Sequence, residues 1–318
     1  MQSEFEFIDN IKKRFGLEMI GDDCAVLPKD NEADMVVTAD LLVEDIDFRL
    51  GWTTPELLGQ KALAVSLSDV AAMGGTPRWA MTTVGVPRHI WDSDFLDRFY
   101  DGWTRIATHY GVELIGGDIS RTPDKIVIDS IVGGDVPKGK AILRSGARPG
   151  DGIFVSGTIG GAAGGLLLLE SGVGYKDTDE NRKALITRQL RPTPRVEVGQ
   201  YLMANDLASA MIDISDGLSS DLHHLCAASG VGATLTFSDV PLDPNLETFS
   251  SGNITHIWAA LSGGEDFELL FTVPQDKISA LKLTDISQIG FVSPNVGTIE
   301  VIADGQTTVL PRSGFTHF

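Results

Sequence analysis

The chain has 318 residues, 42% of them hydrophobic and 35 of them glycine, so it is long enough to bury two cores and too apolar to be disordered. Its formal net charge of −19 excludes nonspecific nucleic-acid binding, which requires a surface excess of lysine and arginine. The same acidity suits divalent cations, which can bring an anionic substrate to a protein that would otherwise repel it.

Only two cysteines occur, Cys24 and Cys226, and they have no metal-type spacing. Neither a disulfide framework nor a zinc site is therefore indicated, and Cys24 is expected to be a small buried residue. The acidic N-terminal segment has no apolar core, and no run reaches the roughly 18 apolar residues of a membrane span. We therefore expect a cytoplasmic protein with no membrane partner.

The first predicted element is an amphipathic helix over residues 3–15, which ends at Gly16. Gly21-Asp22-Asp23 follows and leads into an apolar strand. This pattern fits either a plain acidic turn or a metal ligand held at the edge of a strand. A second strand over residues 35–39 ends in Asp40, and the acidic run beyond it, which includes Asp47, is either a solvated loop or part of a cation site.

The most informative stretch is QKALAVSLSDVAAMGGTP at residues 60–77. A threonine cap and Pro55 predict where its helix begins, and Gly74-Gly75 ends it. Asp69 shares a helical face with Val65 and Ser66 and has no basic residue one turn away. A carboxylate in that setting needs a partner from elsewhere or a bound cation, unless it simply caps the helix or faces solvent.

A strand over 79–86, a helix over 92–110 and a strand over 112–115 are predicted next. The last strand runs into Gly116-Gly117-Asp118, with Arg121 three residues on. This is either an ordinary turn or a metal ligand beside a phosphate clamp. After a strand over 126–132, the segment 134–141 approaches a P-loop, but Ala141 replaces the metal-binding hydroxyl residue and no long apolar helix follows, so we reject that match.

The polar, turn-rich segment 144–151 divides the chain into predicted domains 1–145 and 146–318. In the second half, the glycine-rich turn at 157–165 follows a strand and opens a helix. It is either an anion cradle or a site of close helix packing. Asp213 and Asp216 stand at a strand end before a helix over 218–229, where Asp216 is a metal ligand or the helix cap. His223 and His224 on that helix are not assigned a metal.

Six aspartates from separate elements therefore stand mostly at strand ends or glycine turns, without a matching set of buried cations: Asp23, Asp40, Asp69, Asp118, Asp213 and Asp216. Carboxylate oxygens without histidine or cysteine favour Mg²⁺, which bridges protein to phosphates. The pattern indicates phosphoryl transfer, in which catalysis is mostly positioning and charge neutralisation.

Seven motifs together carry a resemblance that covers nearly the whole chain: GDDCAV at 21–26, KALAVSLSDVAAMG at 61–74, LIGGD at 114–118, RSGARPGD at 144–151, LRPTPR at 190–195, IDISDGL at 212–218 and SGGEDFEL at 262–269. The chain resembles the thiamine-monophosphate kinase family, within the superfamily of aminoimidazole ribonucleotide synthetase and selenophosphate synthetase. The resemblance implies an α/β fold of two domains, an N-terminal sheet domain that forms a homodimer interface and a C-terminal α/β domain. It also implies direct transfer of the ATP γ-phosphoryl group to thiamine phosphate.

By motif position, the resemblance implies that the six aspartates bind several Mg²⁺ ions. It implies ATP contacts at Gly117, Asp118, Arg144 and Ser215, and thiamine contacts at Glu265 and Phe315, where a carboxylate and a ring face suit a cationic thiazolium. Two positions depart from the family pattern. Asp47 stands where a histidine is common, and an aspartate there would repel a substrate phosphate unless a metal ion or water intervenes. Ala39 stands where a hydroxyl residue that helps to hold metal is common.

Two other functions compete with this one. A sister enzyme could make a different phosphorylated product at the same metal–ATP site, although selenophosphate synthetase would need a reactive cysteine in an N-terminal glycine-rich loop, where Cys24 does not lie. An acidic protein that only captures divalent cations gives no reason for Arg144 and the glycine turns.

Overall fold

The computed structural model describes residues 4–17, 19–176, 178–248 and 256–315. The elements of the N-terminal half are α1 (Glu4–Phe15), β1 (Ala25–Pro28), β2 (Ala33–Val43), α2 (Pro55–Ala72), β3 (Thr76–Val86), α3 (Arg88–Trp91), α4 (Phe95–Tyr110), β4 (Glu113–Arg121) and β5 (Val127–Pro137). The C-terminal half contains β6 (Gly152–Ser156), α5 (Gly161–Glu170), α6 (Glu180–Leu190), α7 (Val196–Ala204), β7 (Ala210–Asp213), α8 (Leu218–Ser229), β8 (Gly232–Thr236), α9 (His256–Ser262), β9 (Leu269–Val273), β10 (Ile286–Ser293), β11 (Ile299–Ala303) and β12 (Gln306–Val309), with short 3₁₀ turns at η1 (Phe237–Asp239), η2 (Pro244–Thr248) and η3 (Ile278–Ala280).

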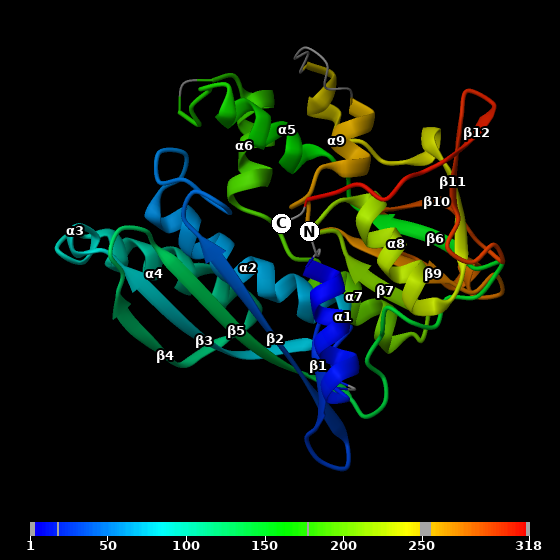
Figure 1. Ribbon diagram of the computed structural model, residues 1–318, viewed down its shortest axis with the longest axis horizontal. Coiled ribbons are helices and arrows are strands. Elements are labelled where there is room, and N and C mark those ends of the chain that lie inside the picture. Colours follow the sequence, from blue (N-terminus) through cyan, green and yellow to red (C-terminus); the bar gives the residue numbers. More distant parts are fainter. Residues whose placement is uncertain (1–3, 18, 177, 249–255, 316–318) are drawn as a thin grey trace.

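Each half is built on one sheet, and the two sheets lie on opposite sides of the molecule (Figure 1). The first sheet has the strand order β1-β2-β5-β3-β4, antiparallel except for the parallel pair β3-β4. The second has the order β12-β11-β8-β10-β6-β9-β7, with one parallel pair, β8-β11. Alternating strands and helices thus form the two-domain α/β arrangement that the sequence predicts.

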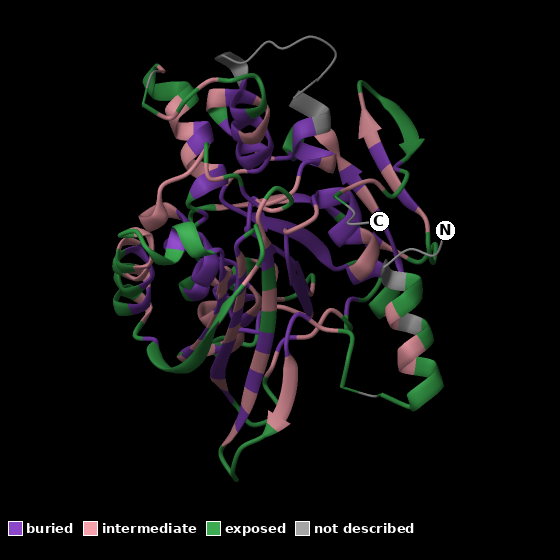
Figure 2. Ribbon diagram, turned by 60° about the vertical axis from the view of Figure 1, so that its left-hand side comes forward, coloured by how far each residue is buried: buried purple, intermediate pink, exposed green. Residues whose placement is uncertain are grey.

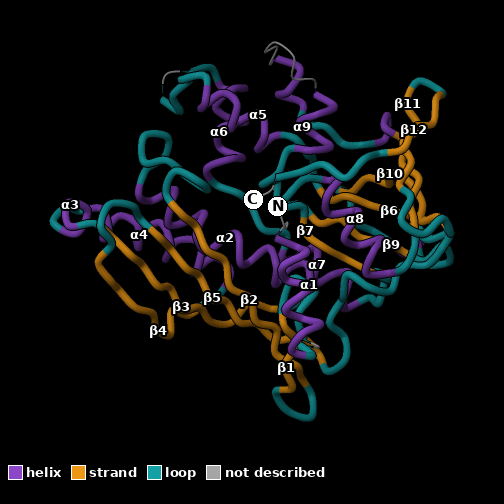
Figure 3. Tube along the Cα trace, viewed as in Figure 1, coloured by secondary structure: helices purple, strands orange, loops and turns teal. Residues whose placement is uncertain are grey.

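Helix α2 lies between the two sheets and touches both, through β2 and β5 on one side and β7 on the other (Figure 3). Its N-terminus is as predicted, with Pro55 at the first position and the Thr54 hydroxyl accepting a hydrogen bond from the Leu57 amide at 3.3 Å. The helix is buried on nearly every side, not only on one face, because the second half covers what would be the solvent side of a two-layer domain.

The buried residues gather in the interior of the molecule (Figure 2). They form a core in each half, and a third cluster joins the two at the contact between the halves. This joining cluster includes Ala71 and Ala72 of α2, Leu202 of α7 and Phe271 of β9. The carboxylate-bearing end of α2 is therefore held rigidly against both halves. None of the helices in the described part of the chain combines the length and apolarity that a membrane crossing requires.

Two predicted boundaries are wrong, and both matter for the site. Strand β2 continues to Val43, so Asp40 lies inside the strand and not at its end. Strand β4 continues to Arg121, so Gly116 and Gly117 lie within a strand and form no turn. A Cβ at Gly117 would meet the Thr82 carbonyl oxygen at 2.0 Å, which explains why a glycine-rich segment pairs here with β3.

Candidate metal and nucleotide site

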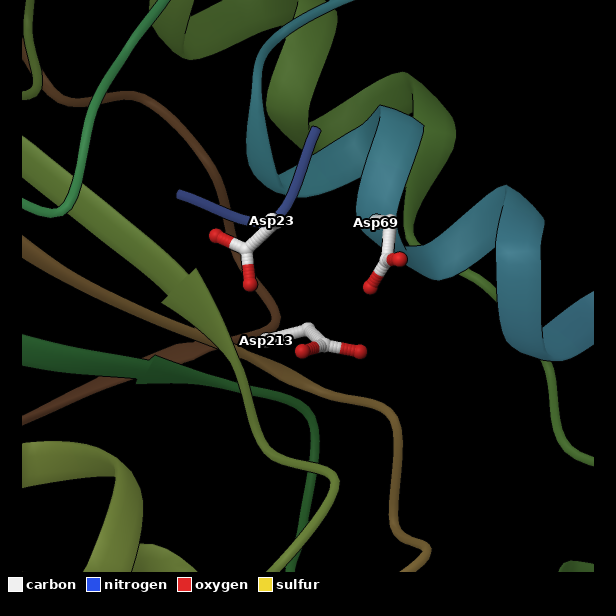
Figure 4. Close-up of side chains that lie close together, drawn as sticks. All are labelled: Asp23, Asp69 and Asp213. Atoms are coloured by element: carbon white, nitrogen blue, oxygen red, sulfur yellow. The ribbon is translucent and has the colours of Figure 1, made fainter. Parts of the chain in front are cut away.

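Three of the predicted carboxylates meet at the junction of the two halves. Asp23 comes from the turn before β1, Asp69 from near the C-terminal end of α2 and Asp213 from the last position of β7 (Figure 4). One oxygen from each lies within 4.8 Å of one from each of the others. The prediction that separate elements bring acids to Asp69 is therefore confirmed for these two partners.

Each of the three is held by one donor. Arg144 Nη2 donates to Asp23 Oδ1 at 2.6 Å, and Ser68 Oγ donates to Asp213 Oδ2 at 2.6 Å. The Thr38 hydroxyl on β2 donates to Asp69, so Asp69 neither caps its helix nor stands free in solvent. Asp23 Oδ2 is buried and has no hydrogen-bond partner among the described residues.

The electrostatics of the cluster disfavour three negative charges without a cation. Burial raises the pKa of Asp213 to about 8, with the nearby charge of Asp23 adding to the effect. Burial also raises the pKa of Asp69 well above its ordinary value, as do the charges of Asp40 and Asp213. A bound cation would replace the protons that these groups otherwise retain.

Two hydrogen bonds join β2 and α2 beside Asp40 and Asp69, one donated by the helix and one by the strand. Thr38 and Asp40 lie two residues apart on β2 and face α2. Ser66 on α2 donates to Asp40 Oδ2 at 2.7 Å, while Thr38 on β2 donates to Asp69. Burial raises the pKa of Asp40 to about 6. The two carboxylates are thus positioned together.

Asp216 follows β7 by three residues, and the structure excludes it as the cap of α8. The cap position is Gly217, and the buried Asp221 accepts hydrogen bonds from the Asp216 and Gly217 amides at 3.2 and 3.0 Å. The Asp216 side chain is therefore not needed at the helix N-terminus. Asp221 is not among the predicted site residues, although an acidic residue in the first turn of a helix is a signal that the sequence contains.

These observations fit a hard divalent cation. The candidate ligands are carboxylate oxygens from three elements. Asp23 Oδ2 is buried without a hydrogen-bond partner among the described residues, and the Thr38 and Ser68 hydroxyls orient Asp69 and Asp213. Mg²⁺ prefers such ligands and typically uses few carboxylates, completing its shell with water and phosphate. Oxygen atoms of Asp23, Asp69 and Asp213 are the ones placed to hold it.

A cavity of about 550 Å³ lies beside this cluster, between the loop after β2 and the elements of the C-terminal half. Its lining contains six of the predicted site residues: Asp40, Asp47, Ser215, Asp216, Glu265 and Phe315. Apolar side chains such as Trp52 and Leu167 make up much of the remaining wall. The structure therefore brings the predicted substrate contacts and two predicted metal ligands to one cavity.

Asp47 lines this cavity but has a clear role within its own loop. Its Oδ2 accepts a hydrogen bond from the Val43 amide at 2.7 Å, which closes the turn after β2.

Glu265 is held in a left-handed backbone conformation, with φ at 68°, and its amide donates to the Ser215 carbonyl oxygen at 2.7 Å. Such a conformation costs about 1 to 3 kcal/mol for a residue with a side chain and is typical of functional sites.

Asp118 is not part of the cluster within this chain, whereas Gly117 pairs with the buried Thr82 on the face of the sheet toward α2. Asp118 pairs in register with Thr83, and Thr83 pairs with Asp129. Register partners share a face of the sheet, and this face is the one opposite to α2. Asp40 pairs with Ser130 on the other face, which is buried under α2. The role of Asp118 in the site stays a prediction.

The glycine-rich turn before α5 binds the carboxylate of Asp266, a residue of the same chain. Asp266 accepts hydrogen bonds from the Gly160 amide at 2.6 Å and the Ala162 amide at 3.0 Å. Arg188 lies 3.5 Å from the same carboxylate. The amides that a ligand would use are therefore occupied, so this turn positions the 263–268 segment instead of binding phosphate.

Several residues that build the site were not singled out from the sequence. The hydroxyls of Thr38, Ser66 and Ser68 orient the carboxylates, and Lys61 and Gln189 contact Glu265. The hydroxyl residues within an otherwise apolar helix were a usable signal. No sequence pattern links Gln189 to Glu265, because they meet only in the fold. Cys24 is buried and free, as predicted.

The fold and the site together define a class of two-domain proteins. Residues 21–136 match the model of the AIR synthase related protein N-terminal domain, and residues 148–300 match that of the AIR synthase related protein C-terminal domain. Structures of the hydrogenase maturation protein HypE share this fold at 18% identity, one of them in complex with ATP and with a TM-score of 0.71.

Within this class, the similarity to one family is much higher. The chain is 37% identical over 308 residues to thiamine-monophosphate kinase of Bacillus subtilis, which covers 94% of this chain and 93% of that one. It is 38% identical over 320 residues to the enzyme of Escherichia coli K12, covering 98% and 96%. A structure of AaThiL complexed with AMPPCP and TMP superposes with a TM-score of 0.88 at 36% identity, covering 99% of this chain and 97% of that one. The chain belongs to the thiamine-monophosphate kinase family.

Proposed function

We propose that this protein transfers the γ-phosphoryl group of ATP to the phosphate of thiamine phosphate, producing thiamine diphosphate and ADP. The observation that carries the proposal is the convergence of Asp23, Asp69 and Asp213 beside a cavity of substrate size. The near full-length similarity to thiamine-monophosphate kinases and to a structure containing AMPPCP and TMP supports the choice of substrates.

In the proposed reaction, an oxygen of the thiamine phosphate attacks the γ-phosphorus of ATP in line with the bridging oxygen to the β-phosphorus. The bond to that bridging oxygen breaks, and ADP leaves. Bound Mg²⁺ supplies charge neutralisation of the phosphate oxygens. The protein contributes positioning, with Asp23, Asp69 and Asp213 at the centre and Asp40 and Asp216 at the boundary with the cavity. No side chain is assigned as a general base.

The nucleotide is proposed to lie on the side of the cluster where Arg144 is found. Arg144 holds Asp23 through one guanidinium nitrogen, and its Nε is buried without a hydrogen-bond partner among the described residues. A guanidinium with donors to spare suits a phosphate oxygen. Ser215, at the cavity wall next to Asp216, is the proposed second contact to ATP.

The thiamine moiety is proposed to occupy the apolar part of the cavity. Glu265 provides a carboxylate for the cationic thiazolium, and Phe315 a ring face. The Phe315 amide donates to the Asp216 carbonyl oxygen at 3.0 Å, which ties this contact to the metal side of the site. Asp47 is proposed to line the substrate site while it stabilises its own loop.

A homodimer is proposed through the first sheet. Strand β4 lies at the sheet edge, all its residues are exposed, and Ile115 and Ile119 are 54% and 48% exposed. An exposed apolar edge strand is a surface that proteins normally cover. Asp118 lies on this strand, facing away from its own chain's cluster, so we propose that Gly117 and Asp118 serve the site of the partner copy.

The proposed division into domains falls at residue 145, between β5 and β6. A cytoplasmic location is proposed, because both cysteines are free and buried, as is usual in a reducing compartment.

The test is a product assay with purified protein, ATP, Mg²⁺ and thiamine phosphate, in which thiamine diphosphate and ADP are separated and quantified. We expect equal amounts of the two products, and none when thiamine replaces thiamine phosphate. Absence of thiamine diphosphate with all reactants present would refute the proposal. A chelator added to a parallel reaction should abolish turnover.

A further inference from the structure

Lys61 is a buried cation that the proposed reaction does not use directly. It lies on α2, eight residues before Asp69 and therefore on the same face about 12 Å away. Only 2% of the residue is exposed, although it is part of the cavity wall. A buried ammonium costs several kcal/mol unless acceptors surround it, so its partners define what it does.

The three donors of Lys61 Nζ have three acceptors on three different segments. The Glu265 Oε1 atom lies at 2.7 Å, the main-chain oxygen of Gln189 at 3.3 Å and that of Asp47 at 3.4 Å. These acceptors belong to three of the segments that line the cavity. Because an ammonium has only three hydrogens, none remains for a substrate phosphate. Lys61 therefore acts through the groups that it holds.

Glu265 is the most constrained of these groups. Its Oε1 meets Lys61, its Oε2 accepts a hydrogen bond from the side-chain amide of Gln189, and its backbone is fixed in the left-handed region. A carboxylate can only accept, so the Gln189 nitrogen must face it. This leaves Gln189 Oε1 buried without a hydrogen-bond partner among the described residues, a cost retained to hold Glu265 in place.

We propose that Lys61, assisted by Gln189, is a positioning residue that fixes the Glu265 carboxylate in the cavity and thereby sets the affinity for the cationic heterocycle of the substrate. The inference rests on the proposed function, because it assigns that heterocycle to this cavity. Helix α2 then carries Asp69 beside the proposed position of the phosphates and Lys61 beside Glu265, the carboxylate proposed to recognise the heterocycle. Its length fixes their separation.

The test compares K61M, E265Q and the K61M/E265Q double variant with the wild type. As a matched control, K29M removes a lysine that forms an exposed ion pair with Asp135. K61M should raise the KM for thiamine phosphate on the order of tenfold and leave the KM for ATP within about twofold. The double variant should match E265Q alone, because Lys61 acts only through Glu265. K61R should recover part of the loss.

An unchanged KM for thiamine phosphate in K61M, an equal rise for both substrates, or additive effects in the double variant would each overturn the inference. If K61M does not fold, the charge-neutral double variant decides, since a KM clearly above that of E265Q contradicts the proposal and an equal KM supports it. Calorimetric titration with thiamine separates this inference from the proposed activity. Even if the wild type forms no thiamine diphosphate, K61M should bind thiamine about tenfold more weakly, and equal affinity would overturn the inference.

Discussion

Ser68 donates a hydrogen bond to Asp213, with 2.6 Å between Oγ and Oδ2. Ser68 belongs to α2, which packs on the first sheet, and Asp213 is the last residue of β7 in the second sheet. This bond joins the two halves at the position where Asp69 and Asp23 also converge. Closing the halves therefore gathers like charges, and a divalent cation would convert that repulsion into stabilisation.

The first prediction concerns Asp69. Asp69→Asn should lower turnover by about a hundredfold or more, because it removes a negative oxygen from the centre of the carboxylate cluster. The fold should survive and gain stability in chelator, since an amide oxygen can still accept from Thr38 and one like charge is lost. Turnover and thermal melting would be measured together, with Asp135→Asn as the control, because Asp135 is partly exposed and pairs with Lys29 and Arg78 outside the cluster. Wild-type turnover in Asp69→Asn would show that this residue is only structural.

The second prediction concerns pH. In the metal-free protein the pKa of Asp213 is raised to about 8 and that of Asp40 to about 6, chiefly by burial, against an ordinary value of 3.8. Between these values the folded state holds protons that the unfolded state has released. The stability from these groups is therefore fully present below about pH 4 and is lost as pH rises through about 6 and then about 8.

Denaturant midpoints measured from about pH 5 to about pH 8 should therefore fall with rising pH in chelator and fall much less in Mg²⁺. The difference between the two series of midpoints gives the contribution of these carboxylates to the pH dependence of stability. His224, whose pKa burial lowers to about 3, contributes to both series alike. Two parallel curves would mean that no cation binds at these aspartates.

The third prediction concerns Asp47, which lines the cavity. Asp47→Asn keeps an oxygen that can accept from the Val43 amide and removes a negative charge from the cavity wall. The KM for thiamine phosphate should therefore stay the same or fall, because a repulsion with the substrate phosphate is lost. Asp47→Ala, which also removes the acceptor, should raise the KM and lower stability by about 1 kcal/mol. A large rise in KM for Asp47→Asn would instead make its charge a direct ligand.

The fourth prediction tests whether Asp118 serves a partner copy. Asp69→Asn and Asp118→Asn should each be nearly inactive alone. After subunits are mixed and allowed to exchange, half of the dimers are hybrid, and each hybrid has one intact site, so activity should return to about a quarter of the wild-type value. Mixing Asp69→Asn with Asp213→Asn is the control. Both residues lie in the cluster of a single chain, so every cluster in the mixture carries one of the two substitutions and no intact site can form. Failure of the first mixture to recover would place Asp118 in its own chain's site or outside any site.

The carboxylates of the site could be predicted from the sequence because acids in apolar or glycine-rich surroundings are conspicuous. Asp69 in an apolar helix and Asp213 at a strand end are such cases, and the fold brings them together. The structure excludes the capping interpretation of Asp216, since Gly217 occupies the cap position of α8 and no side chain accepts a capping hydrogen bond there.

The remainder required the tertiary structure. The hydrogen bonds of Thr38 and Ser68, and the ion pair of Lys61 with Glu265, join segments far apart in the chain and leave no periodic signal. The length of β4 was underestimated because glycine is usually read as a turn signal, whereas Gly117 here lets the edge strand approach Thr82. The glycine-rich turn at 157–165 is a further case, because its amides bind the Asp266 carboxylate from a distant segment. The sequence of the turn does not show whether a ligand or a side chain of the protein fills it.

The most direct test of this account follows the phosphoryl group itself. Protein, Mg²⁺, thiamine phosphate and ATP labelled in the γ-phosphate are mixed and quenched within a single turnover. The account predicts that the label passes from ATP to thiamine diphosphate, with none on the protein and none without Mg²⁺. Label trapped on the protein, label released only as inorganic phosphate, or transfer that survives chelation would contradict it.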